Sequence, residues 1–371
     1  MKKSHNVIGK RVSWVATLVI VMAFSSAFTL LDAFVIPKAY VVVAQAQTEN
    51  PTLALDEVEI AGNASLAGSN SVEPEEGETL ANADLVGSIK AKLDEIAAED
   101  TIGLDAWNTS AEVETTPADT SVGEVQTEVI ITDHSYVDEN ISISVETIEE
   151  NGVVFYVADI QLSDVSYLRT AFANNTFGRN ITQTTSEMAE ANGAIFAING
   201  DYYGFRDTGL IIRNGVLYRD VPENSLSDQS LTIDGEGNFE IVDNSQASGK
   251  SLVEEGVLQS FSFGPTLVED GQVVATVDKT VSQGDNPRTA IGQISPLHYL
   301  FIVVDGRTDT SDGMTLQELA QVFVDRGAEV AYNLDGGGSS AMWLNGTLLN
   351  NPTNGRRAGE RNISDIIYIG Y

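Results

Sequence analysis

The stretch Thr315 to Ser340, TLQELAQVFVDRGAEVAYNLDGGGSS, decides the fold class. Thr315 and Glu318 have the spacing of a capping box, which predicts a helix that begins after Thr315. A short apolar strand follows at residues 329–332, continuous enough to be buried on both faces. The strand stops at the polar cluster of residues 333–340, so a helix, a buried strand and a polar loop follow one another. The predicted apolar face of the helix consists of Leu316, Leu319, Ala320, Phe323 and Val324.

A second helix and strand repeat this arrangement earlier in the chain. The sequence predicts a helix from Thr185 to Ala191 and an apolar strand over residues 194–198, which ends at Asn199-Gly200-Asp201. Ligands in mixed sheets collect at the ends of such buried strands. The two polar clusters therefore predict the position of the functional site.

Four turn dipeptides separate strand-like runs in the C-terminal part. Asn-Gly and Asp-Gly favour type I′ hairpin turns because both residues tolerate positive φ. They predict that antiparallel pairing dominates the domain of residues 129–371. The four turns are Asn151-Gly152, Asn214-Gly215, Asp270-Gly271 and Asn345-Gly346.

The charge composition excludes several function classes. The 371 residues include 20 Lys and Arg against 54 Asp and Glu, a net charge of −34, so the surface would repel nucleic acid. The absence of Cys excludes disulfides, Cys-ligated zinc and thiol nucleophiles, and three His make a poly-His metal site improbable. Catalysis must therefore use carboxylates, hydroxyls, amides and arginine.

Residues 1–46 predict a cytoplasmic tip and a membrane anchor or signal peptide. The run from Val12 to Leu31 carries no charge and is long enough to span a bilayer. Basic residues precede it, which predicts a single-pass protein of the cell membrane with an extracellular C-terminal domain. The alternative is a signal peptide cleaved near Ala46, with Ala44-Gln45-Ala46 as the cleavage site, and a secreted protein.

Residues 47–128 predict an acidic, mostly disordered spacer. Acidic side chains far outnumber Lys90 and Lys92, and too little apolar surface is present to offset the entropy of ordering. Residues 84–100 interrupt this composition with the spacing of a short amphipathic helix. Two interpretations remain open for it: docking on the main domain, or contact with a partner protein.

Three consecutive glycines in the second polar cluster predict an anion site. Gly336 to Gly338 allow the backbone to direct its N–H groups into one concavity, together with Ser339 and Ser340. The alternative is a tight turn at a packed corner. Arginine binds carboxylate or phosphate with two parallel hydrogen bonds, which makes Arg288, Arg307 and Arg361 candidate anion ligands; the alternative for each is a salt bridge.

Four carboxylates in the polar clusters are candidates for acid–base catalysis. Hydrolysis of a sugar bond commonly uses such groups in pairs, although an Asp before Gly is more often a turn residue. These catalytic candidates are Asp201, Asp305, Asp335 and Glu360. Residues 309–313 include two Asp, but their spacing misses the EF-hand pattern, so the sequence predicts no cofactor and leaves calcium as an alternative. His298 precedes an apolar strand and is interpreted as structural.

An ordered series of motifs resembles the phosphodiester glycosidase domain family. The match covers about residues 129–371 and leaves out the anchor and the spacer. The motifs are Asn199-Gly-Asp-Tyr-Tyr203, Ile212-Arg-Asn-Gly215, Phe263-Gly-Pro265, Asn286-Pro-Arg-Thr-Ala-Ile-Gly292, Asp305-Gly-Arg307, Asn333-Leu-Asp-Gly-Gly-Gly-Ser-Ser340 and Gly359-Glu-Arg361.

The resemblance implies an α+β domain with a mixed, largely antiparallel sheet and a few packed helices. It also implies hydrolysis of the bond between a sugar's anomeric carbon and a phosphodiester oxygen. It implies that Arg288, Arg307 and the glycine loop hold the phosphate. The Asp candidates would then bind sugar hydroxyls or stabilise positive charge at the anomeric carbon, with Glu360 as the second choice of acid or base. The predicted binding residues are Asn199, Arg288, Thr289, Arg307, Asn333, Gly336, Gly337, Gly338, Ser339, Ser340 and Arg361.

The substrate class that the resemblance implies is a sugar-1-phosphodiester in a cell-wall, capsular or exopolysaccharide glycan of a bacterium. Two alternatives remain open. The first is a non-catalytic glycan-binding module tethered to the membrane, and the second is an ordinary glycoside hydrolase. The expected partners are the glycan and the membrane, and nucleic acid is not expected.

Overall fold

The computed structural model describes residues 36–42, 129–222, 228–275, 277, 284–355 and 357–371, all of which belong to one compact unit. The apolar run of residues 12–31, the acidic spacer and the predicted helix at 84–100 lie outside these residues. No helix of the described part is long and apolar enough to cross a membrane. The predictions of an anchor and of a spacer therefore stay predictions.

Two sheets form the centre of the described part, and neighbouring strands within both are antiparallel. In order of pairing, the nine-stranded sheet contains β15 (Gln272–Val273), β14 (Thr266–Glu269), β18 (Val330–Asn333), β16 (Arg288–Ser295), β17 (His298–Val304), β5 (Val153–Leu162), β4 (Ile141–Glu150), β3 (Ser135–Val137) and β2 (Ile130–Thr132). The five-stranded sheet contains β20 (Thr347–Leu348), β19 (Met342–Leu344), β8 (Phe196–Asn199), β23 (Asp365–Ile369) and β6 (Leu168–Phe172).

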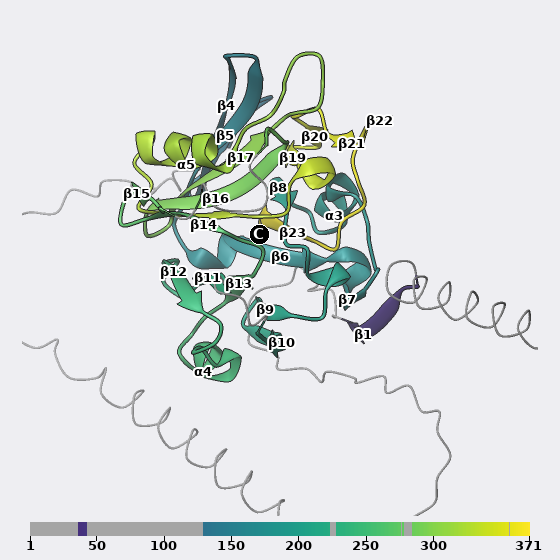
Figure 1. Ribbon diagram of the computed structural model, residues 1–371, viewed down its shortest axis with the longest axis vertical. Helices are drawn as coiled ribbons and strands as arrows, with labels where there is room; N and C mark the ends of the chain where they lie inside the picture. Colours follow the sequence, from purple (N-terminus) through teal and green to yellow (C-terminus); the bar gives the residue numbers. More distant parts are fainter. Residues whose placement is uncertain (1–35, 43–128, 223–227, 276, 278–283, 356) are drawn as a thin grey trace, which may run out of the picture. The chain divides into compact units, whose positions relative to one another are not determined.

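The main hydrophobic core joins the two sheets. Ile160 and Phe301 of the large sheet belong to the same buried cluster as Ile198 and Ile367 of the small one. Each sheet also buries its other face against a helix: α5 (Leu316–Asp325) packs on the large sheet, and α3 (Thr185–Ala191) on the small sheet. Figure 1 shows the two helices and the strands between them.

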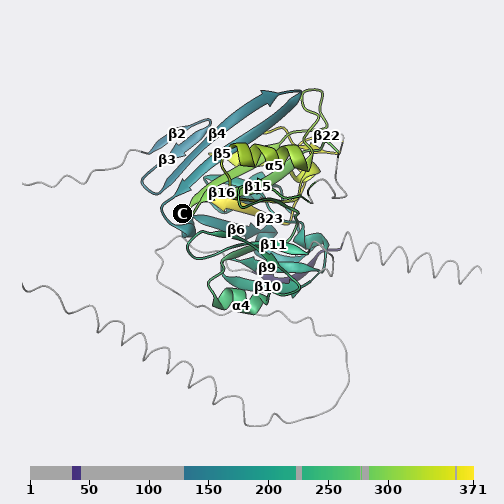
Figure 2. The same cartoon turned by 60° about the vertical axis from the view of Figure 1, so that its left-hand side comes forward.

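Smaller elements complete the described part. They are the hairpin of β9 (Gly209–Arg213) and β10 (Val216–Val221), the three strands β12 (Phe239–Asp243), β11 (Gln229–Ile233) and β13 (Gln259–Phe261), helix α4 (Gly249–Glu254), and the pair β21 (Thr353–Asn354) and β22 (Arg357–Ala358). In Figure 2, β9, β10 and α4 lie away from the long β4–β5 hairpin.

A strand from the N-terminal part also belongs to the fold. β1 (Lys38–Val42) pairs antiparallel with β7 (Thr176–Arg179), although the sequence placed residue 38 in the range of the anchor. The two backbones are so close that a Cβ on Gly178 would lie 1.9 Å from the backbone oxygen of Lys38. β1 therefore joins the fold through pairing with residues about 140 positions further along the chain.

The predicted fold class is confirmed: mostly antiparallel strands with few helices, as in an α+β fold. All four dipeptides connect neighbouring strands of a hairpin, and each has positive φ at both residues, as at Asn151 (52°) and Gly152 (78°). Helix α5 begins with the predicted capping box of Thr315 and Glu318. Helix α3 begins with another such box, formed by Thr184 and Glu187.

Candidate active site

The polar clusters after β8 and β18 are joined by one buried side chain. Asn199, at the end of β8, donates from Nδ2 to the backbone oxygen of Asp335 at 2.6 Å. Its Oδ1 accepts from Thr289 Oγ1 at 2.7 Å and from the backbone N–H of Ala341 at 3.2 Å. Asn199 thus fixes the start of the glycine loop against β16.

A cavity of about 380 Å³ opens beside this loop. Three arginines, a carboxylate and the glycine loop line it, together with apolar groups. The lining residues are Phe263, Gly264, Pro265, Asn286, Arg288, Arg307, Leu316, Asn333, Leu334, Asp335, Gly336, Gly337, Gly338 and Arg361. The structure thus brings together the three predicted arginines, one of the four predicted carboxylates, Asn333 and the three glycines.

Arg288 and Arg307 are close enough to affect each other's charge. Arg288 is buried and donates from Nε to the backbone oxygen of Met314 at 2.9 Å. Burial and the neighbouring charge of Arg307 lower the pKa of Arg288 to about 10. Arg307 donates to Asn286 Oδ1 at 2.8 Å. An anion between the two guanidinium groups would relieve their repulsion.

The backbone of Arg307 is strained. Its φ of 63° lies in the left-handed region, which a non-glycine residue occupies at a cost of order 1 kcal/mol or more. The preceding Gly306 has no room for a side chain, since a Cβ there would lie 2.8 Å from the backbone nitrogen of Pro287. Such strain clusters at functional sites because it holds a side chain where an unstrained loop would not.

The glycine loop leaves room for guanidinium groups. A Cβ on Gly338 would lie 2.5 Å from Arg361 Nη2, and one on Gly337 would lie 3.2 Å from Arg307 Nη2. The backbone N–H of Gly337 donates to the oxygen of Pro287 at 2.8 Å, and those of Ser339 and Ser340 donate within the loop. Fewer N–H groups therefore remain for an anion than the three glycines predicted, and the arginines carry most of the positive charge.

Asp335 is the carboxylate that lines the cavity. Burial raises its pKa to about 6, although the Ser339 hydroxyl and the charge of Arg361 lower it. A carboxyl group with this pKa changes its protonation state near neutral pH, as a general acid or base must.

Asn333 and Ser340 are among the predicted binding residues with a buried polar atom that makes no hydrogen bond within the described residues. Asn333 donates from Nδ2 to the backbone oxygen of Gly264 at 2.8 Å, but its buried Oδ1 has no partner there. The buried hydroxyl of Ser340 also has no hydrogen-bond partner there. A buried polar atom without a partner is rare, and a ligand hydroxyl next to Asn333 would satisfy it.

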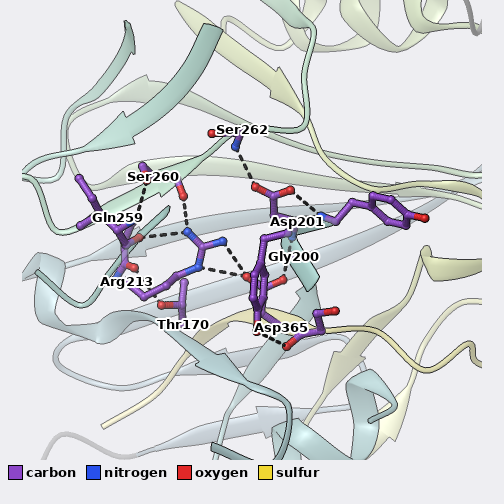
Figure 3. A network of polar contacts seen from close by, with 12 residues as sticks. Thr170, Gly200, Asp201, Arg213, Gln259, Ser260, Ser262 and Asp365 are labelled. Carbon is purple, nitrogen blue, oxygen red and sulfur yellow. Dashed lines mark hydrogen bonds and ion pairs between the residues drawn. The ribbon is translucent and has the colours of Figure 1, made fainter. Parts of the chain in front are cut away.

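Asp201 does not line the cavity and lies in a buried polar network (Figure 3). Its Oδ1 accepts from Arg206 at 2.8 Å and from the backbone N–H of Tyr202, and its Oδ2 accepts from the backbone N–H of Ser262 at 2.8 Å. Although burial raises the pKa of Asp201, the charges of Arg206 and Arg213 lower it below its usual range. The network keeps Asp201 ionised and its oxygens occupied.

Arg213 and Asp365 complete this network, and neither was predicted from the sequence to be a site residue. Arg213 Nη2 and Nε donate to Asp365 Oδ2 at 2.7 Å and 3.0 Å, and Asp365 Oδ1 accepts from the backbone N–H of Asp201 at 2.9 Å. Burial raises the pKa of Asp365 to about 6 against the charge of Arg213. A charged residue at the end of each of two apolar strands was the signal that could have identified them.

The two remaining carboxylate candidates do not line the cavity. Asp305 is buried, and its oxygens accept from Asn350 Nδ2 at 3.0 Å and from the backbone N–H of Asn351 at 3.0 Å. Glu360 accepts from the backbone N–H of Ser186 at 3.1 Å and from its hydroxyl at 2.7 Å, in the first turn of α3. Both carboxylates hold segments of backbone in place.

The alternatives for metal binding gain no support from the geometry. No group of three or more His, Asp or Glu side chains that could hold a metal ion occurs in the described part of the chain. Asp309 and Asp312 are exposed, and His298 pairs with Asp159 at 3.1 Å on the sheet. The expectation that the protein uses no cofactor, with calcium as the alternative, stays a prediction from the sequence.

Comparison with known proteins finds a family model that matches part of the chain. The family model of phosphodiester glycosidase matches residues 192–370. Over these residues, which are just under half of the chain, the protein matches a phosphodiester glycosidase domain. The matched range contains β8, β16, β17, β18 and the glycine loop, and therefore every residue that lines the cavity. It starts later than the predicted range of 129–371, yet β5 pairs with β17, and β4 pairs with β5, in the same sheet.

Two curated proteins match parts of the chain. An uncharacterized protein of Bacillus subtilis, SPbeta prophage-derived YomE, is 32% identical over 205 residues, which are 53% of this chain and 31% of that protein. The N-acetylglucosamine-1-phosphodiester alpha-N-acetylglucosaminidase of Bos taurus is 27% identical over 188 residues, 46% of this chain and 35% of the enzyme. The chain thus spans about a third of the length of these relatives.

A solved structure shares the fold. The zebrafish N-acetylglucosamine-1-phosphodiester alpha-N-acetylglucosaminidase catalytic domain, auto-inhibited by pro-peptide, superposes with a TM-score of 0.51. The alignment covers 62% of this chain and 83% of the zebrafish domain at 21% identity. At this identity the likeness concerns the fold alone.

Proposed function

We propose that this protein hydrolyses the bond between the anomeric carbon of a sugar and an oxygen of a phosphodiester. One observation carries the proposal: three guanidinium groups and one carboxyl group with a raised pKa line the same cavity in a phosphodiester glycosidase domain. An ordinary glycosidase has no need of a cluster of arginines. A substrate with a phosphate bound to a sugar requires guanidinium groups for the phosphate and a carboxyl group for the reaction at the sugar.

The arginines would bind the phosphate and stabilise it as it leaves. Arg288 and Arg307 repel each other, so a negatively charged phosphate group between them is stabilised by both guanidinium charges. A phosphodiester is a weak base when it leaves, and its departure needs little protonation. The reaction therefore does not require a second carboxylate as a strong general acid.

Asp335 would act on the sugar side as the general base. In the proposed step, the oxygen of a water molecule bonds to the anomeric carbon while Asp335 takes its proton. The electron pair of the broken carbon–oxygen bond leaves with the phosphate. Asn199 fixes the loop that carries Asp335, and the unpartnered Oδ1 of Asn333 would accept a hydrogen bond from a sugar hydroxyl.

The proposed substrate class is a sugar-1-phosphodiester in a cell-wall, capsular or exopolysaccharide glycan. The setting proposed for the reaction is outside the cytoplasm, with the apolar run of residues 12–31 as a membrane anchor. N-acetylglucosamine is the first sugar to test, because the bovine relative is named for it.

An assay with three substrates tests the proposed function. The full chain is incubated with a UDP-sugar, with a methyl phosphodiester of the same sugar, and with an aryl glycoside of that sugar, and free sugar is measured. The proposal predicts release from the two phosphate compounds and none from the aryl glycoside. Turnover of the aryl glycoside alone would indicate an ordinary glycosidase, and saturable binding without turnover would indicate a glycan-binding module.

An arginine variant links the assay to the cavity. Arg307→Ala removes a cation that could contact the phosphate, and we expect kcat/KM for the phosphodiester to fall about 100-fold or more. The matched control is Arg326→Ala, which removes an arginine from an ion pair with Glu146 outside the cavity. Equal activity of the two variants would contradict the assignment of Arg307 to the phosphate.

A further inference from the structure

Three aromatic side chains form a row that begins at the cavity wall. Phe263 lines the cavity. The ring of Tyr202 packs edge-on against it, with centroids 6.4 Å apart, and Phe205 stacks on Tyr202 at 4.9 Å. Tyr202 is 37% exposed, so part of its ring is accessible to a ligand.

One buried carboxylate holds both segments that carry this row. Asp201 accepts from the backbone N–H of Tyr202 on one side and from that of Ser262, the neighbour of Phe263, on the other. Arg206 donates to Asp201 Oδ1 and to the backbone oxygen of Ser262, both at 2.8 Å, and its guanidinium lies 6.0 Å from the Phe263 ring centroid. Asp201 is therefore a positioning residue for the aromatic row.

The row differs in chemistry from the arginines of the same cavity. Guanidinium groups bind phosphate oxygens, whereas an aromatic face binds the apolar C–H face of a sugar ring and leaves the hydroxyls in water. A rigid aromatic surface loses little conformational entropy on binding. The hydrogen bonds from the backbones of Tyr202 and Ser262 to Asp201 reduce this loss further. The row also continues past the cavity, where a single sugar would leave Tyr202 uncovered.

We propose that Phe263, Tyr202 and Phe205 form a platform for carbohydrate, with Phe263 against the sugar that carries the phosphate and Tyr202 against a second sugar ring. The proposal rests on the proposed function and narrows its substrate class. The preferred substrate is the phosphodiester of an oligosaccharide or polysaccharide, and a single phosphorylated sugar is a poorer substrate.

Two substrates and one variant test the platform. The full chain and Tyr202→Ala are assayed with methyl phosphodiesters of N-acetylglucosamine and of its trisaccharide. We expect the unmodified protein to use the trisaccharide with a kcat/KM about tenfold higher. Tyr202→Ala should lose this preference and keep its activity on the single sugar within about twofold. Tyr40→Ala, which removes an exposed ring from β1, is the control and should keep the preference.

Two results would overturn the platform: equal use of both substrates by the unmodified protein, or an equal loss on both substrates in Tyr202→Ala. If Tyr202→Ala instead impairs a UDP-sugar more than either methyl phosphodiester, the row binds a nucleobase and the carbohydrate assignment fails.

A binding measurement separates failure of the platform from failure of the proposed function. If no substrate is hydrolysed, the trisaccharide of N-acetylglucosamine without phosphate is titrated into both proteins by calorimetry. Binding weakened about tenfold in Tyr202→Ala would support the platform and reject the hydrolysis. Equal binding, or no binding to either protein, would overturn the platform.

Discussion

Asn199 Nδ2 donates a hydrogen bond of 2.6 Å to the backbone oxygen of Asp335, 136 positions away in the sequence. Asn199 ends a strand of the five-stranded sheet, and Asp335 follows a strand of the nine-stranded sheet. The bond therefore connects the two sheets at the point where the candidate site lies. It also fixes the backbone that carries the carboxyl group of the proposed general base.

Asn199→Asp should weaken the candidate site without changing its volume. The aspartate cannot donate to the Asp335 oxygen, and a lost bond that leaves a buried group unpaired costs about 1–3 kcal/mol. We expect a lower Tm and a kcat reduced by about tenfold or more. Thermal unfolding and steady-state kinetics measure the two effects. A variant with unchanged Tm and kcat would show that this bond does not position Asp335.

Asp335 should determine the acid limb of the pH–rate profile. Its pKa is raised to about 6, and the proposed general base must be ionised. We therefore expect kcat/KM to fall as the pH falls through about 6, with half of the activity lost near that value. Asp335→Asn should abolish this limb along with most of the activity. A limb near pH 4 would instead indicate a carboxyl group with an ordinary pKa.

The same raised pKa predicts that ionised Asp335 reduces the stability of the fold. The unfolded carboxyl group ionises near pH 3.8, whereas the folded one keeps its proton until about pH 6. Between these values unfolding releases a proton, so stability falls as the pH rises. Asp335→Asn should thus raise Tm more at pH 7 than at pH 4. An equal change in Tm at both values would contradict a raised pKa.

Gly338→Ala should displace Arg361 and leave the fold intact. The new Cβ would lie 2.5 Å from Arg361 Nη2, the flexible end of a side chain, and Gly338 has no positive φ that would strain an alanine. We expect a KM raised by about fivefold or more with little change in Tm. The control is Gly235→Ala, where the nearest atom, the backbone oxygen of Gly256, is 3.6 Å away. Equal kinetics in both variants would show that Arg361 does not contact the substrate.

Arg213→Ala should destabilise the protein strongly. The substitution leaves Asp365 buried without its partner, which typically costs about 3–5 kcal/mol. Denaturation with urea measures this loss. Lys250→Ala removes one member of an exposed pair with Glu254 and should change stability by about 0.5 kcal/mol or less. A similar effect of both variants would mean that the buried network contributes little.

The sequence predicted the local features of the fold. The turn at Asn151-Gly152 and the capping box at Thr315 depend on residues close together in the chain, whose chemistry is sufficient to specify them. The pairing of β1 with β7 and the ion pair of Arg213 with Asp365 join distant segments, and no local pattern encodes such contacts.

The sequence predicted the position of the candidate site better than the roles of its carboxylates. The resemblance implied that Arg288, Arg307 and the glycine loop lie together, and they line one cavity with Asp335. The sequence could not show which carboxylates face the cavity. Asp201 and Asp305 lie in equally polar motifs, yet their oxygens accept bonds from the backbone and from neighbouring side chains.

Hydrolysis in water enriched in ¹⁸O tests the central claim most directly, because it identifies the bond that is broken. The full chain is incubated with a sugar-1-phosphodiester, and the sugar and the phosphate product are analysed by mass spectrometry. Attack at the anomeric carbon predicts ¹⁸O in the sugar and none in the phosphate. Label in the phosphate would show cleavage of the phosphorus–oxygen bond, and would contradict the account of this protein as a phosphodiester glycosidase.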